Sequence, residues 1–112
     1  MSCIFCRIAD GTIPSNRIYE DDKVVAFYDL DPQAPIHFLV IPRQHIHSCN
    51  ELNEENCAIV GHIFTVIARL AEQLGMEKGY RIVNNCGEDG GQTVQHLHFH
   101  VLGGRSLAWP PG

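Results

Sequence analysis

The feature that most constrains this chain is a run in which histidines alternate with apolar residues, Gln95-His96-Leu97-His98-Phe99-His100-Val101. Successive side chains of a β-strand point to opposite faces, so every second residue shares a face. The run therefore predicts a strand over residues 95–102 with three imidazoles in a row on one face. Its apolar residues would pack into a core on the other face.

A row of three imidazoles allows three interpretations. It could be a polar surface strand, or it could bind a metal ion, because two histidines two positions apart can share one ion. It could also be catalytic, because a neutral histidine attacks phosphorus well and a neighbouring histidine can hold it in the reactive tautomer.

A glycine-rich loop precedes this run and favours the catalytic interpretation. Glycines let backbone N–H groups approach an anion closely, and the loop adds two side chains with donors, Gln92 and Thr93. Alone, the loop is equally typical of a plain hairpin turn. Directly before three histidines, it indicates phosphate binding over the histidine face.

The remaining pattern predicts one α+β domain over residues 1–112. Strands are expected over 17–20, 23–29, 36–41 and 80–84, a short helical turn over 3–9, and a long helix over 54–74 between Asn53 as N-cap and Gly75 as C-cap. Together they form a five-stranded antiparallel sheet with one long helix and one short N-terminal helix. One helix covers only one face, so we expect a second copy of the chain to bury part of the rest.

Composition excludes several classes of function. The net charge is -5 with only 8 Lys and Arg, which argues against wrapping a nucleic-acid backbone but allows a single nucleotide. No apolar stretch is long enough to span a membrane, and the start does not resemble a secretory signal. The number of cysteines is odd, at five, so a disulfide framework is not expected. A cytoplasmic location is the default.

Two further polar residues are candidates for the site. His37 lies in an apolar strand, where a histidine is more often a satisfied core residue than a functional one. Asp29 ends the preceding strand; its carboxylate could start a turn, or it could bind the two hydroxyls of a ribose.

On these residues the sequence resembles the histidine triad (HIT) family, and within it the histidine triad nucleotide-binding proteins, which are purine nucleoside phosphoramidases. The resemblance covers nearly the whole chain. It rests on His96-Leu97-His98-Phe99-His100-Val101-Leu102, Cys3-Ile4-Phe5-Cys6-Arg7-Ile8, Asp29-Leu30-Asp31-Pro32-Gln33-Ala34-Pro35-Ile36-His37, Gly90-Gly91-Gln92-Thr93 and Trp109-Pro110-Pro111-Gly112.

The resemblance implies a homodimer with a sheet continuous across the interface. It implies hydrolysis of purine nucleoside 5′-monophosphoramidates, in which AMP or GMP is joined to an amine or a lysine, through a covalent nucleotidyl-histidine. His98 matches the nucleophile, His100 the residue that orients it, and His96 a partner that helps protonate the leaving amine. His37 matches a fourth active-site histidine.

The resemblance also implies the nucleotide site. Asp29 matches the ribose ligand, and Trp109 matches a tail residue that reaches toward the partner subunit's site. The apolar slot for the base corresponds to Ile4, Phe5, Ile8, Phe27 and Leu30. The phosphate side corresponds to Asn85, Gly91, Gln92 and Thr93.

The sequence departs from this branch in three places, and the third concerns a metal. Thr93 replaces the usual serine, and Gln95 replaces a bulkier residue. Cys3-x-x-Cys6 is absent from many phosphoramidases of the branch, but in other HIT proteins two such cysteines bind structural zinc with two histidines, which match His45 and His96 here. If His96 binds zinc, it is not a free proton donor.

Three alternatives stay open. A HIT hydrolase of dinucleoside polyphosphates, or of another nucleotidyl anhydride, would use the same nucleophile with a different leaving group. A nucleotide-binding regulatory protein, or a zinc-binding scaffold, would use the same fold with little or no catalysis.

Overall fold

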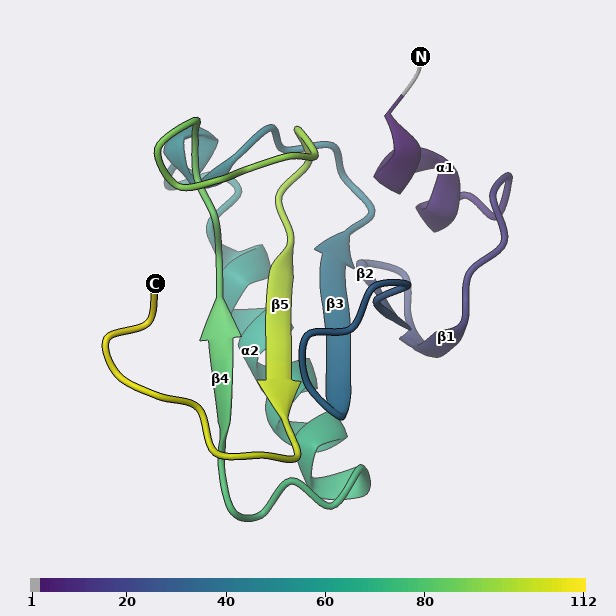
Figure 1. Ribbon diagram of the computed structural model, residues 1–112. Coiled ribbons are helices and arrows are strands. Elements are labelled where there is room, and N and C mark those ends of the chain that lie inside the picture. The colour runs from purple at the N-terminus through teal and green to yellow at the C-terminus, as the bar shows by residue number, and fades with distance from the viewer. Residues whose placement is uncertain (1–2) are drawn as a thin grey trace.

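Strand β3 (Ile36–Pro42) is the centre of a five-stranded antiparallel sheet in the computed structural model, which describes residues 3–112 (Figure 1). The strand order is β1-β2-β3-β5-β4. The other strands are β1 (Arg17–Glu20), β2 (Val24–Tyr28), β4 (Tyr80–Val83) and β5 (Phe99–Gly103). The predicted α+β fold with a five-stranded antiparallel sheet and two α-helices is confirmed.

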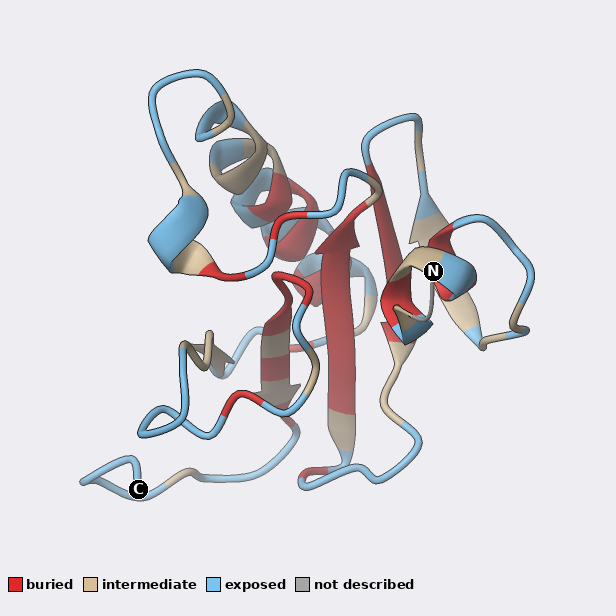
Figure 2. Ribbon diagram, turned by 90° about the horizontal axis from the view of Figure 1, so that it is seen from above, coloured by how far each residue is buried: buried red, intermediate tan, exposed pale blue. Residues whose placement is uncertain are grey.

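The two faces of the sheet are covered by different helices. Helix α2 (Ala58–Gln73) packs on one face, where Phe38 and Val40 of β3 join its core. The short helix α1 (Ile4–Ala9) packs on the other face, against Leu39 and Ile41. Figure 2 shows β3 buried along most of its length between the two helices. Residues of β3 and β5 that share the α1 face are therefore partly sheltered from water.

The long helix begins later than the sequence predicts. The side-chain oxygen of Asn53 accepts hydrogen bonds from the N–H groups of Glu55 and Asn56, at 2.8 and 3.1 Å, so it caps a separate turn over 54–57. Helix α2 starts only at Ala58. At its other end Gly75 has a φ of 75°, the left-handed conformation expected of a glycine that follows a helix.

The apolar face of α2 is also rotated from the one that the sequence suggests. The apolar residues of 54–74 favour a face that includes Phe64 and Ala68, but both are exposed, whereas Val66 and Leu70 are buried. The ring of Phe64 still contacts Phe99 edge-on, with 5.6 Å between centroids. None of the helices within 3–112 combines the length and apolarity needed to cross a lipid bilayer.

The histidine run is mostly outside the sheet ladder, contrary to the predicted strand over 95–102. Strand β5 begins at Phe99, which pairs with Val40, the last residue of β3 to pair with β5. Before it, the chain is held by Leu97 N–H, which donates to the carbonyl of Ile46 at 2.6 Å. The alternation of side chains persists nonetheless, because Leu97, Phe99 and Val101 all lie in the core under α2.

Candidate active site and metal-binding group

His98 is held in one tautomer by the main chain of the same run. Its Nδ1 lies 2.7 Å from the carbonyl oxygen of His96, and a carbonyl can only accept, so Nδ1 carries the proton. In the neutral ring Nε2 is then the unprotonated nitrogen. The ring is 4% exposed and packs edge-on against Phe5, with 5.0 Å between centroids. His98 thus has a fixed ring with a free lone pair.

His100 and His37 form a hydrogen-bonded pair on the α1 face. Leu39 pairs with His100 across β3 and β5, so His37, two residues along β3, is its diagonal neighbour. The N–H of Gln33 donates to Nδ1 of His37 at 3.0 Å, which leaves the His37 proton on Nε2. That nitrogen lies 2.9 Å from Nδ1 of His100 and donates to it. The remaining proton of His100 is therefore on Nε2.

Burial keeps these three rings neutral at pH 7. It lowers the pKa of His37 and of His98 from the ordinary value. For His100, burial and then the neighbouring His98 and His37 lower the pKa to about 4. The rings of His98 and His100 are 5.1 Å apart between centroids. A neutral nucleophile next to a neutral N–H donor is the state that attack on phosphorus requires.

An apolar slot opens beside these rings. It is a cavity of about 230 Å³ between α1 and the β2–β3 connection. Its lining includes Asp29 and all five apolar residues that the family resemblance assigns to the base, namely Ile4, Phe5, Ile8, Phe27 and Leu30. The hydroxyl oxygen of Ser15, which also lines it, is buried and without a hydrogen-bond partner among residues 3–112.

Asp29 lies where the slot meets the histidines. One carboxylate oxygen accepts from the N–H of Asp31 at 2.8 Å. The other lies 3.4 Å from Nε2 of His37 and 3.9 Å from Nδ1 of His100. The carboxylate therefore lies between the apolar slot, which it lines, and the histidine pair.

In the glycine-rich loop (residues 87–93), the Gln92 side chain holds the loop together. Its oxygen accepts from the N–H of Gly87 at 2.9 Å, and its nitrogen donates to the carbonyls of His47 and Val94 at 2.8 and 3.1 Å. In this conformation its amide is fully used, so donation to a phosphate would fall to backbone N–H groups. Of the other residues matched to the phosphate side, Thr93 and Gly91 are exposed and Asn85 is half-buried.

A possible metal-binding group lies beyond His98. It consists of Cys3, Cys6, His45 and His96, whose donor atoms lie within 4.8 Å of one another. Nδ1 of His96 is 3.4 and 3.5 Å from the sulfurs of Cys3 and Cys6 and 3.2 Å from Nδ1 of His45. The sulfur of Cys6 is 3.3 Å from Nδ1 of His45. The sequence predicted these four residues, although up to 93 positions separate them.

A hydrogen bond to the main chain fixes the tautomer of His96. Its Nε2 lies 2.8 Å from the carbonyl of Pro42, to which it donates, so the lone pair is on Nδ1 and faces the sulfurs. Burial, and then the neighbouring Cys3, raise the pKa of Cys6 to about 11. A cation among these four atoms would hold the sulfurs as thiolates. His96 is fully buried, with both ring nitrogens occupied, and is not free to reach a substrate.

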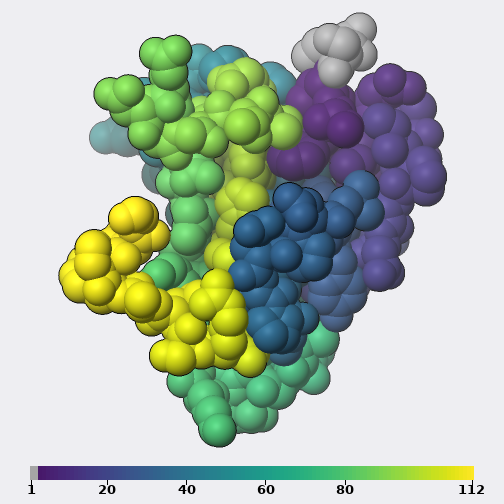
Figure 3. All heavy atoms as spheres, in the orientation of Figure 1, coloured from purple at the N-terminus to yellow at the C-terminus, as the bar shows by residue number. Residues whose placement is uncertain are grey.

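Trp109, a predicted site residue, does not line the apolar slot in the single chain. It is 81% exposed in the C-terminal tail, which stands out beside β4 (Figure 3). The tail is tied back by Arg81, which donates to the carbonyl of Ala108 at 2.9 Å.

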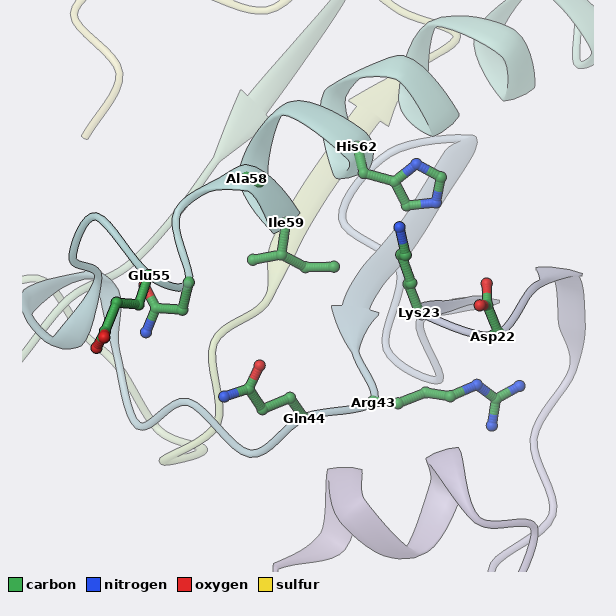
Figure 4. A pocket seen from close by; sticks show the side chains of 9 residues that line it. Asp22, Lys23, Arg43, Gln44, Glu55, Ala58, Ile59 and His62 are labelled. Carbon is green, nitrogen blue, oxygen red and sulfur yellow. The ribbon is translucent and has the colours of Figure 1, made fainter.

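A separate hollow of about 350 Å³ lies between α2 and the adjoining ends of β2 and β3 (Figure 4). It shares no residue with the histidine cluster. The Lys23 side chain extends toward His62, whose Nε2 is bonded to the carboxylate of Asp21 at 2.7 Å. Arg43 at its edge is already bonded to the carbonyls of Asp21 and Ala9. The hollow shows no chemistry beyond these structural contacts.

Sequence reasoning missed three residues that position the site. Gln33 sets the tautomer of His37 through its N–H, and Pro42 does so for His96 through its carbonyl. Asn84 donates from its side chain to the carbonyl of His98 at 2.9 Å. Two of the three act through the backbone, which leaves no trace in the type of residue. Only Asn84, a polar residue at the end of an apolar strand, offered a signal.

Comparisons with known proteins agree with this geometry. A family model described as the HIT domain matches residues 10–107. An uncharacterized HIT-like protein from Synechococcus elongatus is 52% identical over 109 residues, 97% of this chain and 96% of its own length. The crystal structure of a HIT family hydrolase from Legionella pneumophila has a TM-score of 0.97 and 45% identity, covering 99% of this chain and 100% of that chain. A histidine triad protein from Clostridium difficile has a TM-score of 0.94 and 50% identity, covering 96% and 95%.

The fold and the site together define a small α+β protein with a histidine run beside an apolar slot and a Cys₂His₂ group. With these relatives over nearly its full length, the chain belongs to the HIT family.

Proposed function

We propose that this protein hydrolyses purine nucleoside 5′-monophosphoramidates, AMP or GMP joined to an amine or a lysine, through a covalent nucleotidyl intermediate on His98. The observation that carries the proposal is the bond from Nδ1 of His98 to the carbonyl of His96, which leaves Nε2 as a fixed, unprotonated nucleophile. The family to which the chain belongs includes a protein described as a hydrolase.

The reaction would proceed in two displacements at phosphorus. Nε2 of His98 forms a bond to phosphorus as the P–N bond to the amine breaks, and water then attacks phosphorus and releases His98 with the nucleoside monophosphate. The Nε2 proton of His100 would donate to a phosphoryl oxygen, with His37 holding the ring in that tautomer. Because His96 is occupied in the metal-binding group, the departing amine would take its proton from water rather than from His96.

The nucleotide would extend from the apolar slot past Asp29 to the glycine-rich loop. The base would enter the apolar slot, the ribose hydroxyls would bind Asp29, and the phosphate would meet the backbone of the glycine-rich loop together with Asn85 and Thr93. Because its lining is apolar, the slot would accept either adenine or guanine.

We propose Zn²⁺ as the ion of the metal-binding group, in a structural role. Tetrahedral zinc with two sulfur and two nitrogen ligands places sulfur and nitrogen about 3.6 Å apart and the two nitrogens about 3.3 Å apart. The observed separations of 3.3–3.5 Å between sulfur and nitrogen and 3.2 Å between the two nitrogens fit this geometry. When bound, zinc supplies charge neutralisation for the two thiolates and a cross-link between α1, the segment after β3 and the histidine run.

We also propose a homodimer. Strand β4 is an edge of the sheet, and Tyr80 on it is 39% exposed, so a second copy could extend the sheet there. Leu30 and Trp109, both assigned to the nucleotide site, are 98% and 81% exposed in one chain. A partner subunit would shelter them. We infer that residues 1–112 act as a single domain in the cytoplasm, where thiol ligands stay reduced.

Turnover of two substrates tests the proposal. The kcat/KM for an adenosine 5′-phosphoramidate should exceed that for a diadenosine polyphosphate by about tenfold or more, and His98→Ala should lose roughly 10³-fold or more. The reverse preference would favour the dinucleoside polyphosphate hydrolase. Tight AMP binding with no turnover by the wild type would favour a regulatory nucleotide-binding protein.

A further inference from the structure

The connection from α1 to β1 forms one wall of the apolar slot (Figure 1). Its residues 13–16 all line the slot. At one end of the wall, the N–H of Ile13 donates to the carbonyl of Arg7 in α1 at 3.0 Å. At the other end, the N–H of Tyr28 in β2 donates to the carbonyl of Asn16, also at 3.0 Å. The wall is therefore fixed to the helix on one side and to the sheet on the other.

Within this wall, Ser15 carries a hydroxyl that has no hydrogen-bond partner. Among the described residues, 3–112, its Oγ is the one side-chain oxygen or nitrogen that is buried and makes no hydrogen bond. A buried hydroxyl destabilises a fold when it loses its bonds to water and gains none. Stability therefore does not account for this hydroxyl, and a ligand in the slot could supply the partner.

The other polar residues of the lining are placed differently. The ring of Tyr28 packs against the core on the α2 side of the sheet. One carboxylate oxygen of Asp29 is bonded to the N–H of Asp31, and the other lies beside the histidine pair. Asn16 is exposed to water. Ser15 is therefore the lining residue whose polar atom is buried and uncommitted among apolar neighbours.

A purine base in the slot would have the complementary need. Its ring nitrogens N3 and N7 are hydrogen-bond acceptors, and burial in an apolar slot would leave them without partners. A serine hydroxyl can donate one hydrogen bond. The Ser15 oxygen is covered in this structure, but rotation about the Cα–Cβ bond moves no other heavy atom of the residue. The hydroxyl has three staggered positions at this bond and can turn toward a base.

We propose that the Ser15 hydroxyl donates a hydrogen bond to a ring nitrogen of the bound purine, N3 or N7, and so fixes the orientation of the base in the slot. This inference rests on the proposed function, because it takes a purine nucleotide as the ligand. Adenine and guanine both carry these two acceptors, so the contact orients either base without distinguishing them. Ser15 binds the base and takes no part in the displacements at phosphorus.

The test compares AMP affinity with the stability of the nucleotide-free protein. In calorimetric titrations at pH 7, Ser15→Ala should bind AMP about five- to tenfold more weakly than the wild type. Without nucleotide, the same variant should unfold at the same temperature as the wild type or at a higher one, because an unpaired buried hydroxyl has been removed. Ser106 is an exposed serine outside the slot, and Ser106→Ala is the control that should change neither quantity.

Base analogues distinguish a direct contact from a general change in the slot. The nucleotides 3-deaza-AMP and 7-deaza-AMP each carry carbon in place of one ring nitrogen. One of them should bind the wild type about five- to tenfold more weakly than AMP, and Ser15→Ala should not weaken its binding further. The other analogue should behave as AMP does in both proteins.

Unchanged AMP affinity in Ser15→Ala would overturn the inference. A lower unfolding temperature of this variant, or an equal loss of affinity for AMP and both analogues, would make the hydroxyl a structural group and overturn it as well. So would loss of the preference for AMP over the analogue in Asn16→Ala but not in Ser15→Ala, since the exposed amide would then bind the base.

The same measurements separate this inference from the proposed function. If AMP does not bind the wild type, the proposed function fails and the base contact fails with it. If AMP binds, the Ser15 results hold and no phosphoramidate is turned over, the base contact stands and the proposed function alone is wrong.

Discussion

The ring of His98 is bonded to the carbonyl of His96, at 2.7 Å, while the ring of His96 belongs to the metal-binding group. His96 therefore fixes the His98 ring through its main chain and contributes a ring nitrogen to the metal-binding group through its side chain. The position of His98 depends on how firmly the segment before β5 is fixed, since that segment lies outside the sheet ladder. We therefore expect a metal ion in this group to support the candidate active site without entering the proposed reaction.

This arrangement predicts the effect of losing the metal. Cys6→Ser should lower the zinc content from one ion per chain and reduce kcat about 10- to 100-fold, because the His96 segment loosens around His98. Metal analysis and turnover of the purified variant would measure both. Cys57→Ser is the control and should change neither. Full zinc content and full activity in Cys6→Ser would show that these four residues neither bind zinc nor support the active site.

The His100 ring predicts a pH dependence of stability. Its pKa is about 4 in the folded protein, against an ordinary value of 6.5. Between these pH values the unfolded chain binds the proton and the folded protein does not, so the free energy of unfolding falls as the pH drops from 6.5 toward 4. The wild type should lose on the order of 2 kcal/mol more than His100→Gln between pH 7 and pH 4.5 in urea titrations. Equal losses in the two proteins would show that this ring does not resist protonation.

The hydrogen bonds to the Asp21 carboxylate, which lies outside the histidine cluster, should stabilise the folded protein. Burial alone would raise its pKa, but bonds from the N–H of Lys23, from His62, from the N–H of Val24 and from Tyr19 outweigh it and hold the pKa well below the usual range. Asp21→Asn should lower the free energy of unfolding at pH 7 by about 1–3 kcal/mol. The exposed neighbour gives the control, and Asp22→Asn should stay within about 0.5 kcal/mol of the wild type. Denaturant unfolding of both variants would decide this, and similar values would contradict the assigned network.

Replacement by alanine should be harmful at Gly90 and favourable at Gly61. A Cβ at Gly90 would collide with the backbone of Cys86, so Gly90→Ala should distort the glycine-rich loop and weaken AMP binding by about tenfold or more. Nothing lies within 4 Å of a Cβ at Gly61 inside α2, so Gly61→Ala should stabilise the protein by about 0.5–1 kcal/mol. Calorimetry of AMP binding and thermal unfolding measure the two effects. Unchanged AMP affinity in Gly90→Ala would mean that the loop does not bind the phosphate.

The sheet could be predicted from the sequence because its signals are local. Runs of β-forming residues bounded by turn residues indicated the five strands, and Gly75 indicated the end of α2. The ends of elements were less predictable, since they depend on partners elsewhere in the chain. Strand β5 starts at Phe99 because the chain before it leaves β3, where Leu97 N–H donates to the carbonyl of Ile46 instead. Helix α2 starts at Ala58 because Asn53 caps an earlier turn.

The candidate site could be predicted as a set of residues but not as a geometry. The resemblance indicated Asp29 and the apolar slot, and the structure brings them together. The tautomers of His37 and His98 are set by backbone groups that no residue type reveals. The Gln92 side chain bonds the loop internally and is not a free donor, because the fold places the carbonyl of His47 beside its amide nitrogen.

The most direct test of covalent catalysis is mass spectrometry of the intact protein after brief exposure to an adenosine 5′-phosphoramidate ester. We expect a transient species one adenylyl group heavier in the wild type and none in His98→Ala, with both proteins still binding AMP. An adduct that persists in His98→Ala, or its absence from a wild type that turns the substrate over in rapid-quench samples, would contradict the assignment of His98 as the nucleophile.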